Sequence, residues 1–199
     1  MPEFVKNYFD ELKKTIDLMS IEDTKKAVNM IYKAYKENKQ IFIIGNGGSA
    51  ATASHFSCDL NKGTINRIYD NNERRFRVIS MADNISILTA YGNDLSYDDI
   101  FSQQLKNLVN KGDMVIAITG SGNSKNIING LKASAELGAA TVAFLGFDGG
   151  KAKELVDHYV LVPSTHYGRI EDIHLVLCHL ISTYITEMKK KESKEKPIR

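Results

Sequence analysis

The stretch that decides the fold covers residues 41–60 and reads IFIIGNGGSAATASHFSCDL. It opens with four apolar residues, Ile41 to Ile44, which is typical of a short strand buried on both faces of a sheet. The glycine-rich segment 45–48 then ends the strand, because glycine accepts positive φ and lets a ligand approach the main chain. Ser49 is suited to cap a helix that begins at Ala50. We therefore predict a strand, a glycine loop and a helix in direct succession.

A glycine loop at the start of a helix favours anion binding, because free N–H groups and the helix dipole both point toward the ligand. The loop has no Gly-Lys-Ser/Thr of a Walker A motif and lacks the third glycine of a dinucleotide fingerprint. A tight turn without a ligand is the alternative interpretation.

On the predicted helix, His55 and Asp59 lie four residues apart and hence on one face. Their alternative interpretation is a simple surface pair.

The composition limits the classes of function. A chain of 199 residues is long enough for one domain with a substantial core. Its formal net charge of +2 argues against a dedicated nucleic-acid-binding protein. The two cysteines, Cys58 and Cys178, form no CxxC motif and favour a reducing compartment. With no apolar run near the roughly 18 residues of a membrane span, and no signal-peptide pattern at the start, we expect a cytoplasmic protein without membrane or nucleic-acid partners.

Predicted strands and helices alternate along the chain. We predict strands at 41–44, 76–79, 114–118, 141–145 and 159–162, and helices at 3–18, 21–38, from 50, 83–88, 96–109, 125–137, 151–156 and 169–188. This alternation predicts an α/β fold: a three-layer sandwich with a five-stranded parallel sheet, flavodoxin- or Rossmann-like, preceded by two extra helices. We interpret 1–188 as a single domain and the charged segment 189–199 as a disordered tail.

The first helix is amphipathic. Its apolar stripe has a member at every fourth residue, namely Phe4, Tyr8, Leu12 and Ile16. Because two helices before the first strand are more than a minimal sheet needs, we predict that they pack against a second subunit. Packing on their own domain is the alternative.

A second small-residue loop, Thr119-Gly120-Ser121-Gly122-Asn123-Ser124, follows the third predicted strand. In an open parallel sheet, ligands bind outside the carboxyl ends of the strands, so both loops fall on the same edge. Hydroxyl and backbone N–H groups without a lysine suit the phosphate monoester of a small molecule better than a nucleoside triphosphate.

Several motifs together resemble those of the sugar isomerase (SIS) domain, and within it the phosphoheptose isomerase family. They are GNGGSA at 45–50, HF and DL at 55–60, GND at 92–94, TGSGNS at 119–124 and RIEDIH at 169–174 with His179. The resemblance runs from about 41 to 185. It implies an aldose–ketose isomerase that converts sedoheptulose 7-phosphate to D-glycero-heptose 7-phosphate. It also implies a zinc ion and a homotetramer with active sites at subunit interfaces.

The resemblance also implies roles for individual residues. The implied substrate-binding residues are Asn46, Gly47, Gly48, Ser49, Asn93, Asp94, Thr119, Gly120, Ser121, Ser124 and Glu171. The implied metal ligands are His55, Asp59, Glu171 and His179, and the implied catalytic residues are Asp59, Glu171 and His179.

The chain departs from the family pattern at three of these positions. Asp59 stands where the family usually has glutamate, Glu171 where it has glutamine, and Gly120 where it has a hydroxyl residue. Two neutral histidines and two carboxylates still suit Zn²⁺ or another divalent metal ion. Glu171 and His179 share a helical face but lie about 12 Å apart along the axis. His174 is a rival ligand, and its alternative interpretation is a packing residue.

An aldose–ketose isomerisation moves a proton between adjacent carbons through an enediol or enediolate. It needs a base for the carbon-bound proton, an acid near the oxygen and a group that stabilises the oxyanion. Asp59 and Glu171 are candidate bases, and His179 is a candidate acid or ligand. The alternative function is a non-catalytic sugar-phosphate-binding or protein-interaction member of the same fold. A binding protein has no need for two histidines and two acids in one place, so the enzyme is the favoured interpretation.

Overall fold

The computed structural model describes residues 1–195 and contains one five-stranded sheet with strand order β2-β1-β3-β4-β5. The strands are β1 (Gln40–Gly45), β2 (Arg77–Ser80), β3 (Met114–Thr119), β4 (Ala140–Leu145) and β5 (His158–Leu161). All four pairings are parallel, which confirms the predicted sheet.

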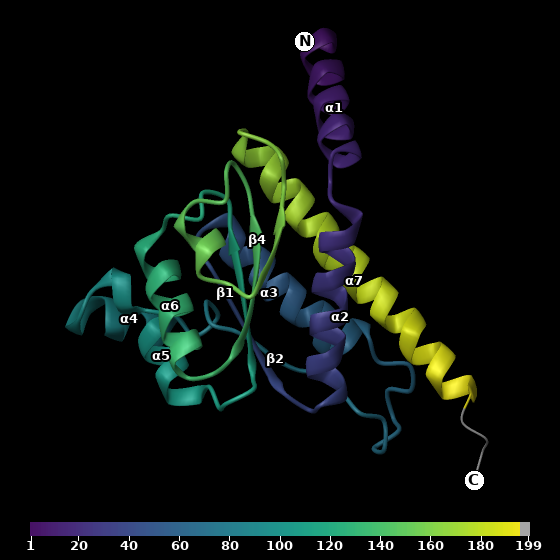
Figure 1. Ribbon diagram of the computed structural model, residues 1–199, viewed down its shortest axis with the longest axis vertical. Helices are drawn as coiled ribbons and strands as arrows, with labels where there is room; N and C mark the ends of the chain where they lie inside the picture. Colours follow the sequence, from purple (N-terminus) through teal and green to yellow (C-terminus); the bar gives the residue numbers. More distant parts are fainter. Residues whose placement is uncertain (196–199) are drawn as a thin grey trace.

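Helices cover both faces of the sheet, as Figure 1 shows, and give the predicted three layers. The helices are α1 (Pro2–Asp17), α2 (Ile21–Lys36), α3 (Gly48–Cys58), α4 (Ile85–Asp94), α5 (Ser102–Leu108), α6 (Lys125–Glu136) and α7 (Tyr167–Glu195). The core on one face is formed with α2, α3 and α7, and the core on the other face with α5 and α6. None of the residues of α4 is buried.

Burial explains why the central strands read as unbroken apolar runs. In β1, Ile41 and Ile43 belong to the core beneath α2, α3 and α7, whereas Phe42 and Ile44 belong to the opposite core. Every residue of β3 is buried as well. Each such large side chain contributes roughly 1.5–3 kcal/mol through its transfer from water.

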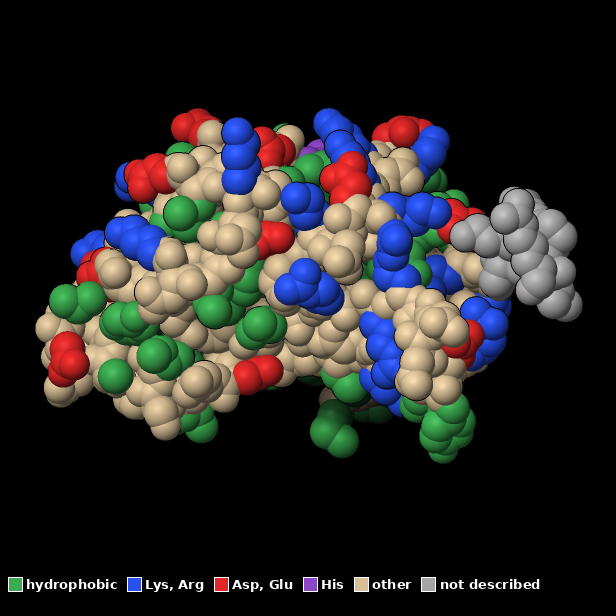
Figure 2. Space-filling model, turned by 90° about the horizontal axis from the view of Figure 1, so that it is seen from below, with side chains coloured by type: hydrophobic (Ala, Val, Ile, Leu, Met, Phe, Trp, Pro, Cys, Tyr) green, Lys and Arg blue, Asp and Glu red, His purple; other side chains and the backbone are tan. Residues whose placement is uncertain are grey.

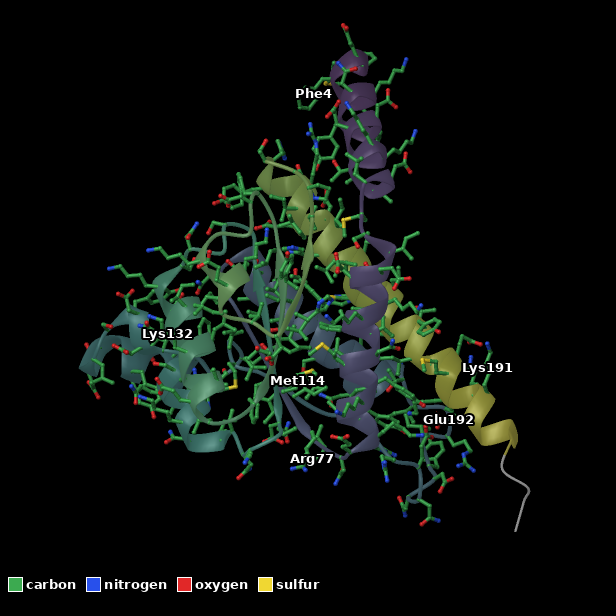
Figure 3. All side chains as sticks on the ribbon, in the orientation of Figure 1. Phe4, Arg77, Met114, Lys132, Lys191 and Glu192 are labelled. Atoms are coloured by element: carbon green, nitrogen blue, oxygen red, sulfur yellow. The ribbon has the colours of Figure 1, made fainter. Side chains whose placement is uncertain are left out.

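The first helix extends beyond the body of the molecule, and Phe4 lies on its projecting part (Figure 3). Phe4 is 73% exposed, whereas the Tyr8 hydroxyl donates to the Asp172 carboxylate on α7 at 2.7 Å. Leu12 packs against the core from the edge. The predicted stripe therefore divides: its middle contacts α7 of the same chain, and its ends remain exposed.

Two helix starts differ from the prediction. The residue before α3 is Gly47, whose φ of 54° suits glycine, and Ser49 is buried inside the first turn instead of capping it. Asn84, not Asp83, caps α4, because its side chain accepts a hydrogen bond from the Ile87 N–H at 3.2 Å. That helix continues to Asp94 through a glycine, where the sequence predicted an end near residue 88.

The predicted helix at 96–109 is divided in two. A 3₁₀ turn spans Tyr97–Asp99, and α5 begins only at Ser102. The Ser96 hydroxyl donates to the Asp99 carboxylate at 2.6 Å and holds this turn.

The last helix begins at Tyr167 and continues to Glu195, so the part of the predicted disordered tail up to residue 195 is helical instead. The Lys189 ammonium, whose side chain is only 5% exposed, pairs with Glu73 at 3.1 Å and donates to the Thr64 carbonyl at 2.6 Å. This anchor holds the helix against the loop that precedes β2. Residues 196–199 lie outside the described residues.

Basic side chains gather on the half of the molecule near the C-terminal end of the chain (Figure 2). A polar cavity there is lined by Lys36, Arg67, Arg74, Lys189 and Lys190 together with Glu73. Among the helices within residues 1–195, none is long and apolar enough to cross a membrane.

Candidate active site

The two glycine loops lie side by side at the carboxyl edge of the sheet. The first follows β1 and the second follows β3, and these strands are neighbours, with Gly45 opposite Ile118. Each loop leads directly into a helix, α3 or α6. Their N-terminal N–H groups therefore open onto one edge, as the sequence predicted.

Hydrogen bonds between its main chain and its own hydroxyl groups shape the second loop. The Gly122 N–H donates to the Thr119 hydroxyl at 3.2 Å, and the Asn123 N–H donates to the Ser121 hydroxyl at 3.3 Å. Ser124 precedes α6 in an extended conformation and makes no side-chain cap hydrogen bond. The hydroxyl groups of this loop are therefore placed at the start of a 12-residue helix, where an anion is favoured.

Gly120 has a local reason to be glycine. A side-chain carbon at this position would lie 3.1 Å from the ring of Tyr167 at the start of α7. A hydroxyl side chain at this position would require the Tyr167 ring to move by a few tenths of an ångström. The departure from the family pattern at 120 is thus matched by a neighbour that the sequence alone did not reveal.

Three of the predicted metal ligands meet at one point. The imidazole Nε2 atoms of His55 and His179 are 2.8 Å apart, and they lie 3.4 and 3.8 Å from Asp59 Oδ2. The helix widens into a π-turn over Asp59–Gly63, so Asp59 begins this wider turn. Single π-turns of this kind are frequent at functional sites.

The donor set fits a divalent cation. Asp59 Oδ2 is buried and receives no hydrogen bond from residues 1–195. Two imidazole nitrogens that face each other at 2.8 Å need a proton or a cation between them, because two lone pairs repel. Two imidazole nitrogens and one carboxylate oxygen match a catalytic Zn²⁺ site that keeps one position open.

Glu171 does not belong to this group of ligands. Its carboxylate instead contacts the first glycine loop, where a side-chain carbon added at Gly48 would lie 2.8 Å from Glu171 Oε2. Gly48 is the first residue of α3, so the carboxylate lies at the positive end of that helix dipole. The structure thus separates Glu171 from the other three predicted ligands and places it beside the loop.

Asn93 and Asp94 occupy the last turn of α4 rather than a loop. Both are exposed, and the Asn93 amide donates to the Asp94 carboxylate at 2.9 Å. The structure of one chain does not bring them into the group of His55, Asp59 and His179.

His174 is a packing residue, in agreement with the alternative interpretation. Its ring is fully buried, and Nε2 donates to the Leu145 carbonyl at 3.2 Å. Burial lowers the pKa of this imidazole to about 4, although the hydrogen bond to Leu145 opposes the shift. The side chain is therefore neutral near pH 7.

Comparison with known proteins agrees with this geometry. The SIS domain family matches residues 5–146. Phosphoheptose isomerase of Aliarcobacter butzleri is 39% identical over 176 residues, which cover 88% of this chain and 90% of that protein. The Aquifex aeolicus phosphoheptose isomerase is 39% identical over 159 residues, or 80% and 81% of the two chains.

This chain belongs to the phosphoheptose isomerase family of SIS-domain enzymes. The solved structure of phosphoheptose isomerase from Neisseria gonorrhoeae superposes with a TM-score of 0.83 at 30% identity, and covers 94% of this chain and 98% of that one. The resemblance inferred from the motifs is thereby confirmed, and so is the SIS fold. As a member of the phosphoheptose isomerase family, the chain is an isomerase.

Proposed function

We propose that this protein converts sedoheptulose 7-phosphate to D-glycero-heptose 7-phosphate through an enediol or enediolate. The name phosphoheptose isomerase, which its relatives carry, supports a heptose phosphate as the substrate. The observation that carries the proposal is the convergence of His55, Asp59 and His179, because His55 lies on α3, the helix that begins at the first glycine loop.

The loops hold the phosphate end of the substrate. Ser121 and Ser124 offer hydroxyl groups, and the N-terminus of α6 offers backbone N–H groups. Anchoring the phosphate there fixes the distance to the reacting carbons, which lowers the entropy lost on reaching the transition state. The first loop, with Asn46, Gly47 and Gly48, lies alongside and contacts the sugar chain.

His55, Asp59 and His179 would hold a divalent cation, for which Zn²⁺ fits the donor set. When bound, such a cation would act as a Lewis acid toward the carbonyl group of the sugar. Glu171 lies outside this group of ligands, beside Gly48, which supports it as the base that takes the carbon-bound proton. His179 Nε2 faces the cation position, so the proton that this half-exposed imidazole can transfer near the oxygen is the one on Nδ1.

We also propose a homotetramer whose active sites lie at subunit interfaces. The exposed apolar residues Phe4, Val5 and Phe9 of the projecting α1 support such contacts. A groove of about 590 Å³ with a largely apolar lining, including Ile16, Ile21, Val176 and Leu180, supports them too. Light scattering at micromolar concentration tests this proposal, and a monomer mass contradicts it.

The activity is tested by incubating the protein with sedoheptulose 7-phosphate and following the sugar signals by NMR. The proposal predicts new signals of a heptose 7-phosphate that grow with enzyme concentration. Binding of the sugar phosphate without any new signals would instead indicate the non-catalytic alternative.

A further inference from the structure

We propose that Asn126 is a positioning residue that fixes the side-chain amide of Asn46, so that Asn46 presents an N–H donor and no acceptor to the substrate. The inference rests on the proposed function, in which Asn46 binds the sugar. Asn46 directly follows β1, and Asn126 lies in the first turn of α6 and is only 2% exposed.

The two side chains form a reciprocal amide pair. Asn46 Nδ2 donates to Asn126 Oδ1 at 2.8 Å, and Asn126 Nδ2 donates to Asn46 Oδ1 at 2.9 Å. Within the pair, each amide therefore gives one hydrogen bond to the other and accepts one from it. Because Asn126 comes two residues after Ser124, the pair also ties the first loop to the helix that follows the second loop.

The main chain decides which way both amides point. An asparagine oxygen and nitrogen exchange places by a half-turn, so their assignment follows from the neighbours. The Ile127 N–H can only donate, and it lies 2.9 Å from Asn126 Oδ1, so that atom must be the oxygen. The other amide atom of Asn126 is then the nitrogen, and the Asn46 atom facing it must be the oxygen.

Tyr97 completes the arrangement. Its hydroxyl donates to Asn46 Oδ1 at 3.1 Å, so this oxygen has two donors, which match its two lone pairs. Asn46 Nδ2 carries two hydrogens, and Asn126 takes one of them. The second hydrogen has no partner within residues 1–195. It is the group that meets an oxygen of the sugar or its phosphate.

The substitution Asn126→Asp tests this inference. A protonated carboxyl reproduces the donor and acceptor of the amide, whereas a carboxylate sets an oxygen against Asn46 Oδ1 and displaces Asn46. The charged neighbours Lys125 and Asp98 pair with each other at 3.4 Å, and the variant keeps both residues. The ratio of variant to wild-type kcat/KM cancels the ionisations that both proteins share.

At pH 8 we expect kcat/KM of the variant to be about tenfold lower than that of the wild type, because KM is higher. As the pH falls, the two values of kcat/KM should approach each other. The control Asn107→Asp adds the same charge on α5, where the amide donates to the Tyr91 hydroxyl and not to Asn46. Its ratio should not vary with pH. A ratio for Asn126→Asp that is independent of pH overturns the inference.

If Asn126→Asp does not fold, a second variant tests the same inference. Tyr97→Phe removes one donor from a side chain that is 63% exposed, so the fold should be retained. We expect KM to rise about threefold with kcat kept, and a wild-type KM overturns the inference. If the wild-type protein binds sedoheptulose 7-phosphate without converting it, the proposed function fails. The affinity of the same variants for this sugar, measured by calorimetry, then tests the role of Asn126.

Discussion

His55 and His179 are 124 residues apart in the chain, yet their Nε2 atoms face each other at 2.8 Å. The pair joins α3 to α7, two helices that pack on the same face of the sheet. Asp59 adds a carboxylate whose buried Oδ2 receives no hydrogen bond from residues 1–195. The fold thus brings together three side chains of the kinds that bind metal ions, one of them on the helix that follows the loop after β1.

The first prediction concerns the metal. His55→Ala removes one of three ligands, so protein purified without chelator should contain much less divalent metal than the wild type, measured by elemental analysis. His166→Ala is the matched control, because the exposed His166 ring contacts Tyr8 rather than Asp59. Equal metal in the wild type and His55→Ala would show that the three residues do not hold the ion.

The second prediction concerns the contact between Gly48 and Glu171. Gly48→Ala should displace the Glu171 carboxylate, because the added carbon lies 2.8 Å from Oε2, and kcat should fall while the melting temperature changes little. Gly45→Ala is the contrast: its added carbon lies 2.6 Å from the Ser49 backbone carbonyl, so it should destabilise the fold. Wild-type kcat in Gly48→Ala would remove Glu171 from the reaction.

The third prediction is a pH dependence of stability from His174. Its pKa is lowered from 6.5 to about 4 in the folded protein, so the unfolded chain binds the proton first as the pH falls. The wild type should therefore lose up to about 1.4 kcal/mol of unfolding free energy per pH unit between 6.5 and 4 from this residue. His174→Gln keeps a donor but does not titrate. Urea unfolding should show a shallower slope for it, and identical slopes refute the assignment.

The fourth prediction concerns the buried pair of Lys189 and Glu73. Burial alone would raise the pKa of Glu73, but hydrogen bonds from the Asn66 and Arg67 N–H groups and from Lys189 outweigh it and lower the pKa. Lys189→Met leaves this carboxylate without its cation and should cost roughly 3 kcal/mol of unfolding free energy.

The neighbouring Lys190 supplies the control. Its side chain is half exposed and pairs with Glu187 on the surface, so Lys190→Met should cost less than about 1 kcal/mol. Equal melting temperatures for the two variants would show that the Lys189 pair does not anchor the end of α7.

The sheet was predictable because its pattern is local. Ile41 to Ile44 and Met114 to Ile118 are buried on both faces and therefore unbroken in apolar character. The end of α7 was not predictable, because its stability comes from Lys189 reaching Glu73, 116 residues away. The charged segment 189–195 does not indicate, from its sequence alone, that one of its lysines pairs with a distant carboxylate.

The candidate site divides in the same way. His55 and Asp59 are four residues apart, so their proximity follows from helix geometry. The contact between His55 and His179 could be predicted only from the family resemblance, because their spacing in the sequence does not indicate it. The positions of Glu171 against Gly48 and of Asn126 against Asn46 depend on how α7 and α6 pack on the loops, which no local pattern reveals.

The most direct test of the central claim compares the rates at which the wild type and His179→Ala isomerise sedoheptulose 7-phosphate. His179 sits half exposed on α7, so its removal should leave the melting temperature close to that of the wild type. We predict that the wild type turns the sugar over and that the variant does not. A variant that isomerises at the wild-type rate would contradict the account.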